Sequence, residues 1–200
     1  MNSIQIVVKE SFSGLLIFGF WILFCLMFDF SFGLFLGIIG LCAWAWAFRN
    51  PERIPFERGE NVFLAPIDGK ISNIERFEKG VRICVDVGLF DSGLVRAPQA
   101  IQEVTLYKKS GLVAYFSTLK TRLNEHLSAT ISGKNPYIIR LFPSIFKHSN
   151  FYAPIAFRLG ERMGFMKFGK LELEIEAPID LQIHIGDKIK GGMSVIGYTK

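Results

Sequence analysis

Two long uncharged stretches dominate the first quarter of the chain. Residues 11–28 comprise 18 positions without a charge, and residues 30–48 comprise 19 more, with one aspartate between the two stretches. At about 1.5 Å per helical residue, each stretch nearly crosses a hydrocarbon core of about 30 Å. Trp44 and Trp46 end the second stretch, where an interfacial aromatic belt would lie. The pattern predicts a transmembrane helical hairpin as the membrane anchor, residues 1–48, with helices at 11–28 and 30–48.

The hydrophobic pattern changes after this hairpin, in residues 49–200. Short segments rich in β-branched residues, such as "VFLAPIDGKISNIERF" and "GVRICVDVGLF", are separated by glycine, proline and aspartate. The segment "KLELEIEAP", residues 170–178, alternates strictly and predicts a half-buried strand with its glutamates outside. Residues 143–160 are the best helical candidate, although Pro154 interrupts them. We therefore expect a mainly β domain over residues 49–200.

The charge distribution adds an orientation to this picture. Lys9, Arg49, Arg53 and Arg58 flank the two apolar stretches, and positive residues favour the cytoplasmic side of a bacterial-type inner membrane. Residues 49–200 hold 22 basic and 16 acidic residues, a net charge of +6. Such a domain suits anionic phospholipid headgroups, although the same excess can merely keep it soluble. We expect both chain ends on the cytoplasmic side, and no nucleic acid as partner.

Two other interpretations of the apolar stretches fit the sequence less well. A secretory signal peptide fits poorly, because only Lys9 precedes the first stretch and no small-residue cleavage site follows it. Two buried core helices are disfavoured by the tryptophans and basic residues that end the second stretch. The three cysteines, Cys25, Cys42 and Cys84, have neither a disulfide nor a metal spacing, which fits a reducing cytoplasmic location.

A short internal sequence repeat gives information about the fold of the β domain. The segment "APIDGKI" at residues 65–71 returns as "APIDLQI" at residues 177–183, each between strand-like segments. The second copy continues as "HIGDKIKGGMSVIG", which resembles the end of lipoyl and biotinyl carrier modules. That resemblance implies a barrel-sandwich hybrid. It does not imply their cofactor, because the modification hairpins of those carriers resemble Asp-Lys or Met-Lys-Met turns in a shorter module.

Six motifs in order and spacing carry a further resemblance. The segments "FRNPERIP", "APIDGKI", "FDSGLVRAP", "NEH", "GERMGFMKFGK" and "GDKIKGGMSVIG" span residues 48–198. Together they are similar to the short, membrane-anchored form of the phosphatidylserine decarboxylase family. The resemblance implies a chain that cuts itself at a Gly-Ser bond, turns that serine into a pyruvoyl cofactor and decarboxylates phosphatidylserine through it. An Asp-His pair prepares the serine in that family.

Three positions of this chain correspond to the family's catalytic residues. Asp68 in "APIDGKI" retains the family aspartate. Gly93 in "FDSGLVRAP" stands at the histidine position, while Val95 replaces an asparagine. Lys170, after Phe168-Gly169, stands at the position of the serine. Because lysine has no β-hydroxyl to attack a carbonyl or to be eliminated, we expect no pyruvoyl group and no other cofactor.

Other serines and histidines offer little as replacements. Ser144 and Ser149 flank His148, but neither serine follows a glycine. His126 and His184 fit structural or surface roles better than catalytic ones. Asp68 itself could be retained because Ile67-Asp68-Gly69-Lys70 is a favourable turn.

The leading hypothesis is a membrane-anchored, catalytically degenerate relative of these decarboxylases. It would bind anionic phospholipid or regulate an active enzyme of phospholipid metabolism. One alternative is an active lyase that makes phosphatidylethanolamine through unrecognised residues. Another is a structural component of the cell envelope.

Overall fold

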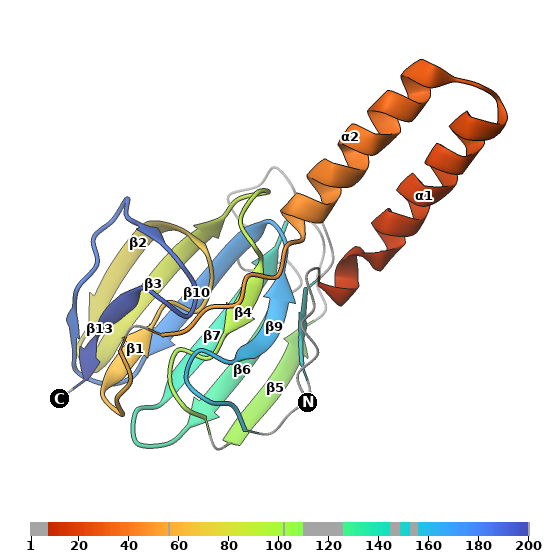
Figure 1. Cartoon of the computed structure of the whole chain (residues 1–200). Helices are drawn as coiled ribbons and strands as arrows, with labels where there is room; N and C mark the ends of the chain where they lie inside the picture. Colours follow the sequence, from red (N-terminus) through yellow and green to blue (C-terminus); the bar gives the residue numbers. More distant parts are fainter. Residues whose placement is uncertain are drawn as a thin grey trace. The chain divides into compact units, whose positions relative to one another are not determined.

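The computed structural model in Figure 1 divides into two compact units, residues 1–52 and 53–200. The structure describes residues 8–55, 57–101, 103–109, 126–144, 149–152 and 156–199. The first unit is helical and the second is built of strands, as the change in hydrophobic pattern predicts.

The helical unit contains two apolar helices joined by a tight turn. A 3-10 turn, η1 (Lys9–Ser11), leads into α1 (Phe12–Met27), and α2 is Ser31–Ala47. Each helix begins and ends within one residue of its predicted segment. In the described part of the chain, one helix, Lys9–Met27, is long and apolar enough to cross a membrane, and α2 is shorter.

Glycines on the two helices leave room for aromatic rings to pack between them. A Cβ built at Gly14 would lie 2.1 Å from the Trp44 ring, and one at Gly37 would lie 2.8 Å from Trp21. The Trp44 indole N–H donates to the Ser11 carbonyl at 3.1 Å. A larger residue at either glycine would therefore push the helices apart. Trp46, by contrast, is 61% exposed.

The second unit is mainly β, with no helix among its described residues. Its strands form a seven-stranded sheet of order β12-β2-β3-β10-β7-β6-β5 and two three-stranded sheets, β1-β13-β11 and β4-β9-β8. Every pairing within these sheets is antiparallel. The strands are β1 Val62–Leu64, β2 Gly69–Phe77, β3 Gly80–Val87, β4 Leu94–Arg96, β5 Glu103–Lys109, β6 His126–Ser132, β7 Tyr137–Pro143, β8 Ser149–Phe151, β9 Arg162–Met166, β10 Gly169–Ile175, β11 Ile179–Leu181, β12 Lys188–Ile189 and β13 Val195–Thr199.

The helix considered for residues 143–160 is not found in the described part of that segment. Ser149–Phe151 forms β8, which pairs with β9, and Phe157 forms a bridge with Ile101. Prolines at positions 143 and 154 disfavour a continuous helix, and pairing with β9 satisfies the backbone of β8 instead. Residues 145–148 and 153–155 lie outside the described residues.

The central strand of the large sheet is β10, which pairs with β3 on one side and β7 on the other. Leu171, Leu173 and Ile175 are fully buried in the core, while Glu172 and Glu174 lie on the opposite face. The half-buried strand predicted from the alternating pattern is therefore confirmed.

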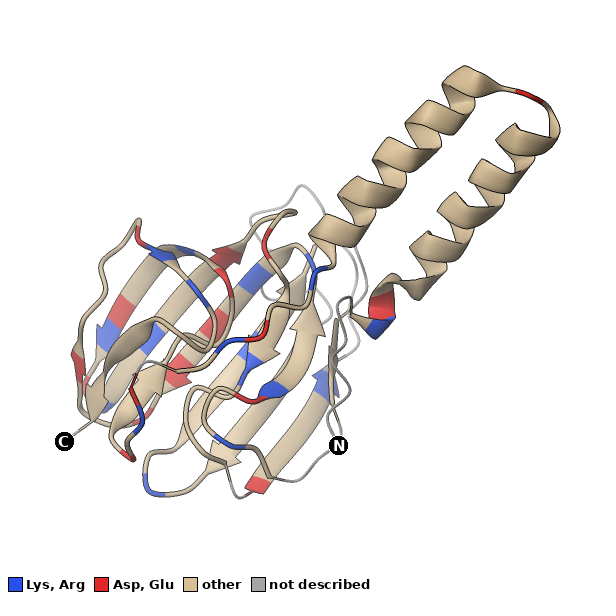
Figure 2. Ribbon diagram, viewed as in Figure 1, with Lys and Arg blue, Asp and Glu red and all other residues tan. Residues whose placement is uncertain are grey.

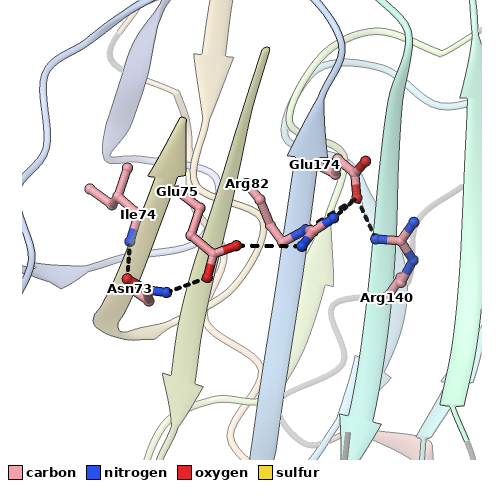
Figure 3. Close-up of polar contacts among 6 residues, drawn as sticks. All are labelled: Asn73, Ile74, Glu75, Arg82, Arg140 and Glu174. Carbon is pink, nitrogen blue, oxygen red and sulfur yellow. Dashed lines mark hydrogen bonds and ion pairs between the residues drawn. The ribbon is translucent and has the colours of Figure 1, made fainter. Parts of the chain in front are cut away.

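A row of charges crosses this outer face, as Figure 3 shows. Glu174 on β10 accepts hydrogen bonds from Arg140 on β7 at 2.6 Å and from Arg82 on β3 at 3.2 Å. Arg82 also reaches Glu75 on β2 at 3.4 Å. Burial alone would raise the pKa of Glu174, but the two arginines hold it below its usual value. This row, Glu75–Arg82–Glu174–Arg140, links four neighbouring strands.

Candidate functional site

The three positions singled out in the sequence lie around one end of the seven-stranded sheet. Asp68 directly precedes β2, and Lys170 is the second residue of β10. The first residues of β2 and β10 flank the end of β3, because Lys70 and Lys170 both pair with Asp86. Gly93 lies in the segment between β3 and β4.

The carboxylate of Asp68 is buried and fully engaged. It accepts two hydrogen bonds from the guanidinium of Arg53, the second at 2.6 Å, and forms an ion pair with it. The Gly191 backbone N–H donates at 2.8 Å and the Ser92 hydroxyl at 3.0 Å. Burial alone would raise the pKa of this carboxyl, but Arg53, Gly191 and Ser92 together hold it below its usual value. Asp68 thus ties three separate segments together.

Gly93 is next to Ser92, whose hydroxyl binds Asp68, so the structure brings Asp68 and Gly93 close together. Gly93 has φ +72°, a conformation that favours glycine, and a Cβ built there would lie 2.9 Å from the Met166 carbonyl oxygen. The same Cβ would lie 3.4 Å from Cδ of Lys167. The Met166 N–H donates to the Gly93 carbonyl at 2.8 Å, which fixes this close approach.

Lys167 is a residue that the sequence reasoning missed. Its side chain is fully buried, and its Nζ donates to the Asp91 carbonyl at 2.5 Å. The aliphatic part of Lys167 therefore occupies space beside Gly93, toward which a side chain at position 93 would extend. A lysine inside the apolar run "GFMKF" was the available signal, because lysine is seldom fully buried without a partner.

Lys170 lies three residues farther along the chain and is half-buried. It follows Phe168, whose φ of +58° is unusual for a residue with a side chain, and Gly169, where a Cβ would lie 2.3 Å from the Phe142 carbonyl oxygen. The register places Lys170 between Asp86 and Phe142 within the sheet. Lys170 therefore lies in a regular strand that is paired on both sides.

The other candidates are spread over the domain. Ser144 is close to the glycine before Lys170, because its N–H donates to the Phe168 carbonyl at 3.0 Å. The His126 ring lies 5.3 Å from that of Phe142, and the side chain of His184 is 88% exposed. His148 lies outside the described residues. Among the described residues, no group of three or more histidine, cysteine or acidic side chains could hold a metal ion.

Two grooves lie away from these positions. The larger, about 620 Å³, is formed by residues 76–81 and 177–181, at the opposite end of β10 from Lys170. The smaller, about 340 Å³, includes Tyr137 and residues 131–135. Neither groove is lined by Asp68, Gly93 or Lys170.

Comparison with known proteins gives one consistent result. The chain is 25% identical over 181 residues to a protein of Syntrophotalea carbinolica, covering 84% of this chain and 83% of the relative. It is 27% identical over 164 residues to a protein of Chlorobium luteolum, covering 76% of each. A protein of Anaplasma phagocytophilum is 26% identical over 195 residues, covering 88% of this chain and 84% of the relative. All three are named phosphatidylserine decarboxylase proenzyme, which confirms the predicted resemblance. No family model and no solved structure matches the chain.

Proposed function

We propose that this chain, a relative of the phosphatidylserine decarboxylases, is a membrane-anchored protein that does not make their pyruvoyl cofactor. In this proposal it binds phospholipid or regulates phospholipid metabolism. The observation that supports the proposal is the lysine at position 170, in β10, which the family motif aligns with the self-processing serine. A lysine side chain has no β-hydroxyl, so an acyl shift and elimination cannot occur at the Gly169–Lys170 bond.

The surroundings of Gly93 support the same conclusion. No side chain is present there to act as a base, and the stem of Lys167 packs beside the position. The residues present therefore do not fit the chemistry that forms a pyruvoyl group. In this proposal both the nucleophile and its base are replaced, so no group remains at either position to start the reaction.

The contacts of Asp68 support a structural role for the retained aspartate. Its two oxygens receive four hydrogen bonds, from Arg53, Gly191 and Ser92. A carboxylate engaged in this way holds the segment after the helices against the start of β2. Its retention needs no catalytic explanation.

The membrane part of the proposal rests on α1 and on the charge of the β domain. A span of Lys9–Met27 would anchor the chain, with α2 returning through the bilayer and the +6 domain on the cytoplasmic side. The second unit would be a barrel-sandwich hybrid in this proposal. Extraction of the protein from membranes should require detergent, and release by salt alone would contradict the anchor.

One observation favours a second candidate, an active lyase that uses another residue. The backbone of Ser144 is hydrogen-bonded to Phe168, so a serine does lie beside the Phe168-Gly169 segment. In that case the chain would be cut despite Lys170. A purely structural envelope protein is the remaining alternative, and it would neither be cut nor bind lipid headgroups.

The intact mass of the purified protein separates these functions. We expect a single species of 22.6 kDa. Either of two cuts would overturn the proposal: fragments of 169 and 31 residues from the Gly169–Lys170 bond, or fragments of 143 and 57 residues, the second with a blocked N-terminus, from the Pro143–Ser144 bond. The measurement must be made under denaturing conditions, because β10 is paired on both sides and would hold cut pieces together. Lys170→Ala is the matched control, since any cut that persists in it does not depend on that lysine.

A further inference from the structure

A second row of charges crosses the outer face of the seven-stranded sheet, at the end where β2 and β10 begin. Lys188 on β12 pairs with Lys70 on β2, Lys70 pairs with Asp86 on β3, and Asp86 pairs with Lys170 on β10. Directly opposite residues of antiparallel strands project to the same face, so these four side chains lie side by side. Figure 2 shows basic and acidic positions on the neighbouring strands β2, β3 and β10. We call Lys70, Lys170 and Lys188 the lysine row.

The lysine row differs from the row Glu75–Arg82–Glu174–Arg140 on the same face. In the latter each charged group has an opposite charge within 3.4 Å. In the lysine row, none of the three ammonium groups has a hydrogen bond or ion pair within the described parts of the chain. The row itself holds three cations and one carboxylate, Asp86, a net charge of +2, and Glu172 follows two residues after Lys170 on the same face.

The pairing within the lysine row also opposes folding. Lys70 and Lys188 are both exposed and directly opposite each other, and like charges at that spacing destabilise a sheet. The one carboxylate, Asp86, accepts a hydrogen bond from the Ser72 hydroxyl at 3.1 Å. An anion bound from outside would relieve the repulsion between the lysines.

Apolar side chains are exposed directly after the same end of β3. Leu89 is 42% and Phe90 60% exposed. Two acidic side chains nearby form hydrogen bonds within their own turns. Asp91 accepts from the Gly88 N–H at 2.7 Å, and Asp187 accepts from the His184 N–H at 2.8 Å. Cations beside exposed leucine and phenylalanine suit the interface of a bilayer better than a soluble anion.

We propose that the lysine row binds the phosphate of an anionic phospholipid at a bilayer surface, with Leu89 and Phe90 entering the headgroup layer. The inference rests on the proposed membrane anchor. Only four residues, 49–52, separate the C-cap of α2 from Arg53. If the helix is anchored in a bilayer, this short linker keeps the β domain close to the bilayer surface. Replacing a hydroxyl by the Lys170 ammonium thus removes a nucleophile and supplies the third cation of the row.

Lysine labelling of the full-length protein in nanodiscs tests this assignment. The protein is incorporated into discs of phosphatidylcholine alone or with phosphatidylglycerol added, treated with an amine-reactive ester, and digested for mass spectrometry. We expect the labelling rate of Lys70, Lys170 and Lys188 to fall several-fold in the anionic discs. The exposed Lys79 and Lys134, at the opposite end of the strands, should react equally in both discs. Equal rates for the lysine row in both discs would overturn the inference.

A second arm distinguishes the source of the phosphate. Adding inorganic phosphate or glycerol phosphate to the phosphatidylcholine discs should leave the lysine row unprotected. Protection by either soluble compound would overturn the assignment to a lipid surface. The proposed function fails in a different way, because a cut chain, or one that does not enter the discs, is detected before any labelling.

A charge-matched pair of variants completes the test. Lys70→Gln/Lys188→Gln removes two cations of the row, while Lys79→Gln/Lys134→Gln removes two elsewhere. All four side chains are exposed, so both variants should fold. Each lysine near an anionic surface is worth about a fivefold change in binding, so the first variant should reduce the protection of Lys170 by fivefold or more. Equal protection of Lys170 in the two variants would contradict the proposal.

Discussion

The guanidinium of Arg53 and the carboxylate of Asp68 form a buried, two-hydrogen-bond ion pair, and the same guanidinium donates to the Gly191 carbonyl at 3.0 Å. Removing one partner leaves the other charge buried and unpaired. We expect Asp68→Ala and Arg53→Ala each to lower the free energy of unfolding by about 3 to 5 kcal/mol. The double variant should lose clearly less than the sum of the two, as measured by urea unfolding in detergent. Additive losses would show that the pair is not a unit.

The pH dependence of the same pair has a defined sign. Folding lowers the pKa of Asp68, so its contribution is present above the ordinary value of 3.8 and is lost as the pH falls through the lower folded value. The stability difference between the wild-type protein and Asp68→Asn should therefore shrink in acid. An unchanged difference would contradict the lowered pKa.

Gly93 should resist substitution. Its φ of +72° and the 2.9 Å approach of the Met166 oxygen predict that Gly93→Ala destabilises the fold by about 1 to 3 kcal/mol. Gly133→Ala is the matched control, because a Cβ there meets nothing within 4 Å. Its stability should be unchanged or slightly raised. Thermal melting compares the two, and equal effects would mean that position 93 does not require glycine.

Restoring the serine alone should not restore self-cleavage. Lys170→Ser regains a hydroxyl, but nothing at Gly93 can take its proton, so the chain should be cut slowly or not at all. Adding Gly93→His should give more cleavage than Lys170→Ser alone, and Asp68→Ala should abolish that gain. Mass spectrometry after a common incubation measures the cut. If thermal melting shows that the double variant is folded, equal cleavage with and without the histidine would show that Gly93 does not correspond to the family base.

Replacing Glu174 should lower the free energy of unfolding far more than replacing Glu172 on the same face. Glu174→Gln weakens its charged contacts with Arg82 and Arg140, and we expect a loss of about 1 to 3 kcal/mol. Glu172→Gln should cost less than about 0.5 kcal/mol, because among the described residues Glu172 has no hydrogen bond or ion pair and only a longer-range attraction to Arg82. Chemical unfolding of the two variants decides the point. Equal losses would mean that the charge row does not stabilise the sheet.

Local patterns predicted the elements whose environment is fixed by their own sequence. The two uncharged stretches correspond to α1 and α2, with bounds that agree within one residue. The alternating residues 170–176 correspond to β10. The helix considered at residues 143–160 was wrong where the structure describes it, because pairing with β9 overrides a local preference.

Contacts between distant segments could not be predicted in this way. Arg53 binds a carboxylate 15 residues away, and Lys167 reaches a carbonyl 76 residues away. Neither partner is implied by spacing, since both depend on how the sheets assemble. The motifs pointed to Asp68, Gly93 and Lys170, whose catalytic correspondence stays a prediction, but not to the buried Lys167 that lies against Gly93.

The pairing of β1 with β13 has a consequence for how the protein is made. Val62 lies opposite Tyr198, and the Thr199 N–H donates to the Asn61 carbonyl, so the first strand of the domain needs the last as its partner. Contacts of such long sequence separation slow folding. The helices can form while synthesis continues, but the sheet β1-β13-β11 cannot be completed until residues 195–199 leave the ribosome. During that interval its unpaired strand edges are exposed to proteases and chaperones.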